Sequence, residues 1–191
     1  LTERAAVQID TARQYDDERH FAFDLVERIG LNERIELISR YLMGVTGAGR
    51  TVVWLAAQDS LVYGGSVGLD MRQERLLRRF DAPIQDLRPE VRRILASGRA
   101  TVADGSALSA LLPAEILDGA GVRTALLLPL RFEGRAIGLI SLDQPFVDRG
   151  FSDLQVRQAT TVAFMSAGAI QQAKTIQEER HMARTLAESF L

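Results

Sequence analysis

The spacing of apolar and polar residues predicts long helices at the two ends of the chain. In residues 1–29, apolar and small side chains recur every three or four positions, which is the spacing of one helix face, and Gly30 ends this segment. Near the other end, Ser152 and Gln155 have the spacing of a capping box, and no proline follows them. A helix is therefore expected from this capping box almost to the last residue.

The middle of the chain has the alternation and turn residues of β-hairpins. Residues 51–58 and 61–69 are rich in β-branched, aromatic and apolar residues, and a turn separates them. Residues 122–132 and 135–143 repeat this arrangement around a Glu-Gly turn. The remaining expected elements are helices over 33–43, 71–80, 89–97 and 113–117, and a short strand over 100–104.

A glycine-rich loop at residues 44–51 resembles a phosphate-binding loop, with Arg50 in the position of the usual lysine. Such a loop needs a strand before it and a helix after it, so that the helix N-terminus can hold the phosphates. Here the expected order is the reverse, with a helix before the loop and a strand after it. The glycines are therefore interpreted as a helix C-cap and a tight turn.

The two terminal helices resemble each other in sequence. When the chain is shifted by about 161 positions, residues 5–27 align with residues 166–188, and the motifs DERH and EERH coincide. Heptad spacing in both segments predicts a parallel homodimer that is joined along a seam of small, apolar and arginine residues. The expected seam residues are Ala12, Tyr15, Arg19, Ala22 and Val26 in the first helix, and Ala173, Ile176, Arg180, Ala183 and Ala187 in the second.

Composition and charge exclude several classes of function. The 23 basic and 25 acidic residues nearly cancel, which does not favour nucleic acid or an anionic membrane as a partner. No apolar run reaches the roughly 20 residues of a membrane span, and the chain is expected to be cytoplasmic. The chain has no cysteine, so thiolate metal sites and cysteine nucleophiles are ruled out. The two histidines, His20 and His181, lie far from the middle, and no catalytic set can be assembled, so the chain is not expected to be an enzyme.

The second hairpin and the helix after it resemble the C-terminal half of a GAF domain. The resemblance extends over residues 31–173 and rests on a PL…G…IG pattern formed by Leu128, Pro129, Leu130, Gly134, Ile137 and Gly138. It implies an α+β, PAS-related fold with a six-stranded antiparallel sheet, flanking helices and long linker helices at both ends. The signatures of GAF domains that bind cyclic nucleotides, bilins or haem are absent, so the cofactor remains unknown.

The resemblance also implies a pocket for an unknown small molecule on one face of the sheet. The candidate lining residues are Trp54, Ala56, Phe80, Leu95, Asp104 and Leu127. Each has a simpler alternative, since Trp54 is more often plain core and Asp104 before a glycine is more often a turn residue.

The last residues are similar to the segment that leads into SpoIIE-like (PPM-type) serine/threonine phosphatase domains. The matching residues are Met182, Ala183, Thr185, Leu186, Ser189 and Leu191. The expected organisation is a linker helix over 1–30, a sensor domain over 31–173 and an exit helix over 174–191 that leads to a phosphatase in the same chain. The alternatives are a ligand-free dimerisation spacer and a sensor that controls a histidine kinase or another effector.

Overall fold

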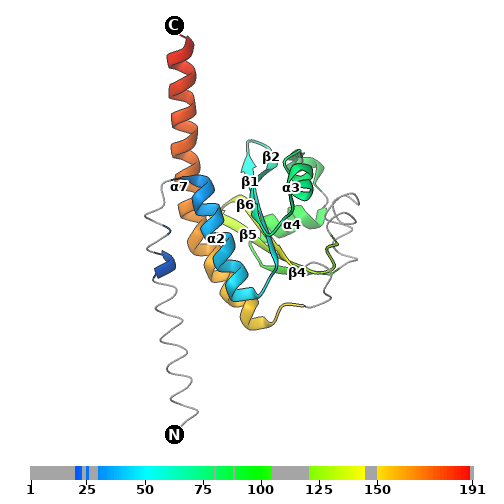
Figure 1. Ribbon diagram of the computed structural model, residues 1–191. Coiled ribbons are helices and arrows are strands. Elements are labelled where there is room, and N and C mark those ends of the chain that lie inside the picture. Colours follow the sequence, from blue (N-terminus) through cyan, green and yellow to red (C-terminus); the bar gives the residue numbers. More distant parts are fainter. Residues whose placement is uncertain are drawn as a thin grey trace.

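An antiparallel sheet lies between two layers of helices (Figure 1). In the computed structural model, the residues described are 20–22, 25, 30–79, 81–87, 89–104, 121–144 and 150–189. Helices α2 (Leu31–Thr46) and α7 (Asp153–Ser189) pack against each other and cover one face. Helices α3 (Met71–Leu77) and α4 (Pro89–Ser97) lie on the other side (Figure 1). The expected α+β arrangement of an antiparallel sheet with flanking helices is confirmed.

The strand order of the sheet is β3-β2-β1-β6-β5-β4. Five of these strands come from segments predicted from the sequence: β1 (Arg50–Ala57), β2 (Ser60–Val67), β4 (Thr101–Ala103), β5 (Ala125–Phe132) and β6 (Arg135–Asp143). The short strand β3 (Asp81–Pro83), followed by a 3₁₀ turn at Ile84–Asp86, was not predicted. It extends the β2 edge by three residue pairs.

Both predicted hairpins are confirmed. Strands β1 and β2 pair in antiparallel register, and so do β5 and β6. The turn between β5 and β6 consists of Glu133 and Gly134, whose φ angles are 49° and 77°. Two successive positive φ angles are what a two-residue type I′ turn requires, and this turn matches the twist of the strands it joins.

The glycine-rich loop is a helix end followed by a turn, as the sequence predicts. Gly47 caps α2 in the left-handed conformation, with φ of 69°, and its N–H donates to the carbonyl of Met43 at 2.8 Å. Strand β1 then begins at Arg50. Because α2 precedes the loop and β1 follows it, no helix begins at the loop, and the arrangement of a phosphate-binding loop is not formed.

Helix α7 is the longest element, with 37 residues. The predicted capping box at its start is present, because Gln155 N–H donates to Ser152 Oγ at 3.3 Å and Ser152 N–H donates to Gln155 Oε1 at 2.9 Å. The helix extends well beyond the rest of the domain (Figure 1). Residues 174–189 of the expected exit helix are therefore helical and continuous with the rest of α7, whereas residues 190–191, most of the expected N-terminal linker helix and the helix over 113–117 lie outside the described residues.

The sheet separates two apolar clusters. One joins the α2–α7 side of the strands to these helices and includes Val53, Leu128 and Ile170. The other lies on the opposite face, between the strands and α4, and includes Trp54, Leu127 and Leu95. Adjacent strand residues belong to different clusters because side chains alternate between the two faces of a strand. Among the described helices, none is long and apolar enough to cross a membrane.

Candidate functional site

Most of the predicted pocket residues lie together on the sheet face that points away from α2 and α7. Trp54, Leu95 and Leu127 are buried in the same apolar cluster, and the partly buried Ala56 packs against it. Asp104 follows β4 and is exposed. Phe80 lies outside the described residues. The resemblance therefore placed four of the six candidates on one surface, which we call the Trp54 face.

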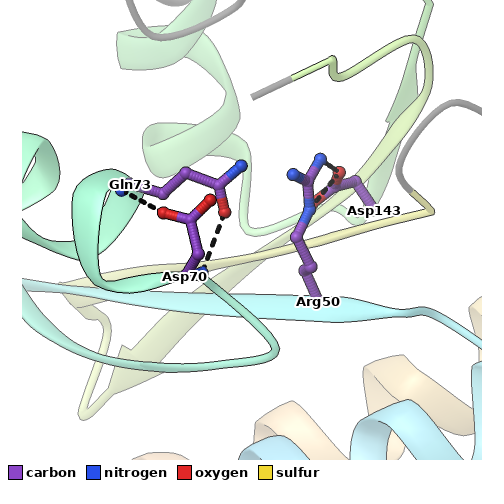
Figure 2. A network of polar contacts seen from close by, with 4 residues as sticks. All are labelled: Arg50, Asp70, Gln73 and Asp143. Carbon is purple, nitrogen blue, oxygen red and sulfur yellow. Dashed lines mark hydrogen bonds and ion pairs between the residues drawn. The ribbon is translucent and has the colours of Figure 1, made fainter. Parts of the chain in front are cut away.

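A buried ion pair lies at one end of the Trp54 face. Arg50 begins β1 and Asp143 ends β6, and these two residues are opposite each other in the antiparallel ladder. The Arg50 Nε–H donates to Asp143 Oδ2 at 3.0 Å, and the Nη2 group donates to the same oxygen. Figure 2 shows this pair beside Asp70 and Gln73, the residues that cap the start of α3. Both members are almost completely buried, with side-chain exposures of 3% and 10%.

The burial of this ion pair has an electrostatic consequence. Removal from water raises the pKa of Asp143, while the hydrogen bond and the positive charge of Arg50 oppose this increase. A buried carboxylate of this kind depends on its partner, because an unpaired charge in an apolar environment is strongly destabilising. Sequence reasoning missed this pair, although a charged residue at the start of an apolar strand is a signal that could have been used.

Aromatic and polar groups meet on the same face, between β2 and α3. The ring of Tyr63 lies edge-on to Trp54, with 6.4 Å between ring centroids. The Tyr63 hydroxyl donates to Glu74 Oε1 at 3.1 Å and is 2.7 Å from Ser66 Oγ. The guanidinium of Arg78 lies 5.0 Å from the centre of the Tyr63 ring. Burial is the largest cause of the raised pKa of the Tyr63 hydroxyl.

The predicted seam residues of α7 differ in exposure. Ala173 is 2% exposed and packs within its own chain, so it has no surface to offer to a second copy. Ile176 is partly buried, and Arg180, Ala183 and Ala187 are exposed. Of the seam residues expected in the first helix, Ala22 is described and partly buried. The other four, Ala12, Tyr15, Arg19 and Val26, lie outside the described residues.

Two cationic side chains connect α7 to the rest of the domain. Arg34 of α2 is buried and donates through Nη1 to the backbone carbonyl of Ala169 at 2.9 Å. Lys174 of α7 donates through Nζ to the backbone carbonyl of Ala56 at the end of β1. Sequence reasoning missed both contacts, because a backbone carbonyl that accepts a long-range hydrogen bond leaves no trace in the residue types.

Two surface hollows lie near α4 and the residues that follow it, and Ile94 and Ala103 of the Trp54 cluster line the larger one. One, of about 320 Å³, is formed between the end of α4, the β5–β6 hairpin and α7, with Phe164 at its rim. The other, of about 440 Å³, lies beside α4 and β4. Neither is lined by any of the six predicted pocket residues. Among the described residues, no cluster of three or more histidine, aspartate or glutamate side chains could hold a metal ion.

Comparisons with known proteins identify relatives of this fold. A family model described as "GAF domain" matches residues 30–170. The structure is similar to the GAF domain of a phosphoenolpyruvate-protein phosphotransferase from Acinetobacter, with 13% identity, a TM-score of 0.70, and coverage of 86% of this chain and 96% of that chain. It is also similar to a GAF domain/HD domain protein from Geobacter sulfurreducens, with 16% identity, a TM-score of 0.67, and coverage of 79% and 98% respectively.

A third similar structure is the chromophore-binding domain of a bacteriophytochrome from R. palustris. The identity is 16% and the TM-score 0.67, over 87% of this chain and 63% of that chain. No curated protein matches the sequence. At such low identities, the structural comparisons establish a common fold.

Proposed function

The chain belongs to the GAF domain family, a family of sensory domains in signalling proteins, and from this premise we propose that it binds a small molecule on the Trp54 face and passes the signal to α7. The observation that carries this proposal is the composition of that face. It combines a cluster of apolar side chains, including Trp54 and Leu127, with polar groups on the same side of the sheet, such as Arg50 and Tyr63. Small-molecule sites typically combine these two features.

The proposed mechanism is a difference in ligand affinity between two packings of the domain. A ligand that prefers one packing shifts the population of the domain towards it, by no more than its difference in binding free energy between the two. Helix α7 is the element that transmits the conformational change out of the domain, because it packs on α2 and contacts β5 and then extends past them.

We further propose that the chain forms a parallel homodimer through α7. The support is the exposed stripe of Arg180, Ala183 and Ala187 at heptad spacing on a helix that has left its own domain. A matched pair of variants tests this. Ala183→Glu/Ala187→Glu places charges in the seam, whereas His181→Glu/Thr185→Glu places them on another side of the same helix.

Analytical ultracentrifugation distinguishes these two variants. The seam variant is expected to sediment as a monomer and the control variant as a dimer, because like charges in a close helix contact repel each other. A dimer in both variants would show that α7 does not hold the chains together.

The effector that we propose is a serine/threonine phosphatase domain C-terminal to α7 in the same chain. Its support is the sequence resemblance of residues 179–191 to the segment that precedes such domains. Phosphatase assays on a chain extended through that domain test it, with the seam variant included. The expected result is a phosphatase rate that depends on an intact seam.

The second candidate function is a dimerisation spacer that binds no ligand. The close packing of Trp54, which is only 5% exposed, favours it, because a filled face leaves less room for a small molecule. Native mass spectrometry of the purified chain separates the two. An additional, reproducible mass on the protein supports a sensor, and the bare protein mass supports a spacer.

A matched pair of strand variants locates the binding face in the same experiment. Ala56 and Ala57 are both partly buried, but they lie on opposite faces of β1. Ala56→Leu fills the Trp54 face, whereas Ala57→Leu adds the same volume on the other side. The additional mass is expected to disappear in Ala56→Leu and to persist in Ala57→Leu.

A further inference from the structure

Helix α7 leaves the domain directly after Lys174. Before this point the helix is packed on the domain, and Ile170 and Ala173 are 0% and 2% exposed. The Lys174 side chain is still largely covered, with an exposure of 20%. Beyond it, Ile176 is partly buried and each residue over 177–188 is exposed. Lys174 is therefore the last polar side chain of α7 that is anchored on the rest of the domain.

The anchor of Lys174 is the strand that carries Trp54. The Lys174 Nζ–H donates to the backbone carbonyl of Ala56, two residues beyond Trp54 in β1. The pairing of β1 with β6 ends one residue earlier, at Leu55 and Gly138. The ammonium group thus bonds to the first carbonyl beyond the end of this ladder. Ala56 is held from two sides, because its side chain packs against the Trp54 cluster and its carbonyl binds α7.

The charge of Lys174 makes this contact specific. A hydrogen bond from an ammonium group is stronger than one between neutral groups, and it is only weakly screened where water is excluded. Lys174 Nζ also lies 3.7 Å from the carboxylate of Glu178, one turn further along, whose side chain is 56% exposed. The chain has no other lysine, so a single amine can be changed without altering any other.

The other polar links between α7 and the domain have a different target, helix α2. Gln155 Nε2 donates to the carbonyl of Thr46 at 2.7 Å. Arg34 bonds to Ala169 and Gln172 from the neighbouring helix α2, at 2.9 and 3.4 Å. These contacts hold the two helices together and do not involve β1. Among the hydrogen bonds described for α7, the Lys174 bond is the one that reaches the strand of Trp54 and Ala56.

We propose that Lys174 is the coupling residue through which a change on the Trp54 face reaches the exit segment of α7, residues 177–189. A shift at the end of β1 moves the Ala56 carbonyl and so changes the restraint on α7 at the point where the helix leaves the domain. This inference deepens the proposed function and rests on its claim that α7 carries the signal. Coupling between two sites is reciprocal, so a change at Lys174 also affects the β1–β2 hairpin.

Hydrogen exchange on the whole chain tests the local contact. Lys174→Met keeps an unbranched side chain that lacks only the terminal amine donor, and Lys174→Arg keeps a charged donor. Glu178→Gln is the matched control, because it neutralises the partner of Lys174 on α7 and leaves the bond to Ala56 in place. Lys174→Met is expected to speed exchange at residues 56–61 about tenfold, the size of effect expected for losing one charged hydrogen bond. The arginine and glutamine variants are expected to stay within about twofold of the wild type.

A double-mutant cycle distinguishes coupling from simple anchoring. Trp54→Phe perturbs the other site, and the readout is the exchange rate of residues 177–188. In the wild-type background this substitution is expected to change that rate, and in the Lys174→Met background the change is expected to vanish. The proposal would be overturned if Trp54→Phe changed the exchange rate of residues 177–188 equally in both backgrounds, or in neither. It would also be overturned if residues 56–61 exchanged at the same rate in Lys174→Met and Lys174→Arg.

These measurements need neither a ligand nor an effector. A bare protein mass in native mass spectrometry would count against the proposed sensor and would leave the exchange result unaffected. Conversely, native mass spectrometry could show a bound ligand while the double-mutant cycle shows no coupling between Trp54 and Lys174. This result would support the sensor and refute Lys174 as its coupling residue.

Discussion

The two faces of the sheet are built from the same strands but differ in the polarity of the side chains that they bury. On the side of α2 and α7, the buried strand residues are apolar apart from Thr51, and the buried Arg34 lies between the two helices and not on a strand. On the Trp54 face, the strands also bury Arg50 and Asp143. Since ionised groups are costly to bury, a face that carries them gains less stability from the same area. We infer that the helix-covered face holds the fold together and the Trp54 face accommodates polar chemistry.

Removing one member of the buried ion pair is expected to have the largest effect. Arg50→Met leaves Asp143 without its charged partner in an apolar environment, and we expect a loss of about 3–5 kcal/mol in the free energy of unfolding. The fluorescence of Trp54, the single tryptophan, reports unfolding in urea. A loss below about 1 kcal/mol would show that the pair behaves like a surface contact.

The control for this prediction removes both charges. Arg50→Met/Asp143→Leu is expected to recover most of the lost stability, because apolar replacements of buried pairs are often neutral or stabilising. A double variant as unstable as Arg50→Met would mean that the shape of the arginine, and not its charge, supports this end of the sheet.

Two adjacent leucines of β5 compare the faces directly. Leu128 points towards α2 and α7 and is 1% exposed, and Leu127 lies on the Trp54 face and is 5% exposed. Truncation of either to alanine is expected to cost about 2–5 kcal/mol, with the larger loss at Leu128. The reason is that the helices α2 and α7 cover Leu128, so the cavity left by its truncation can shrink less than the cavity left at Leu127. Urea unfolding of both variants measures the difference, and a larger loss at Leu127 would reverse our assignment of the faces.

The buried carboxylate also predicts the pH dependence of stability. Because burial raises the pKa of Asp143, the folded state binds more protons than the unfolded state between the ordinary value, about 3.9, and the raised one. The contribution of Asp143 to stability is therefore fully present below the ordinary value and is lost as the pH rises through the raised one. The effect is expected to be smaller than that of Arg50→Met, since Arg50 already offsets part of the burial cost.

Comparison with Asp143→Asn isolates this effect from other titrating groups. We expect the stability of the wild type, relative to this variant, to increase when the pH is lowered from 7 towards 4. Urea titrations at several pH values measure it. A relative stability that falls on acidification would mean that the charge of Arg50 outweighs burial.

The sequence predicted local structure well and long-range polar contacts poorly. The hairpin at Glu133 and Gly134 and the cap at Gly47 were recognised because turns and caps demand particular residues at fixed spacings. The resemblance to GAF domains suggested the pocket candidates, and four of the six lie on one face; alternation along a strand explains why Trp54 and Ala56 share it. The Arg50–Asp143 pair joins residues 93 positions apart. Nothing in the spacing of charges specifies which strand ends meet, so this pair required the three-dimensional structure.

The smallest predicted effect compares two capping boxes, one on each side of the sheet. Asp70 caps α3, where Gln73 N–H donates to Asp70 Oδ1 at 2.7 Å, and Ser152 caps α7. Substitution of either cap by alanine is expected to cost about 1 kcal/mol or less. The consequences differ, because α3 has seven residues and α7 has 37. A helix as short as α3 is marginal without its cap, whereas a long packed helix loses only its first turn.

Hydrogen exchange distinguishes these two outcomes. In Asp70→Ala, amides throughout α3 are expected to exchange faster, and Trp54 should become more accessible to a quencher because α3 helps to cover its face. In Ser152→Ala, faster exchange is expected only at the start of α7. If Asp70→Ala left the rest of α3 protected, the packing of Leu77 and the contacts of Glu74 and Arg78 with Tyr63 would suffice to hold this helix on the sheet. The Trp54 face would then be as firmly closed as the face beneath α2 and α7, and the contrast between the two faces would be restricted to the buried charges.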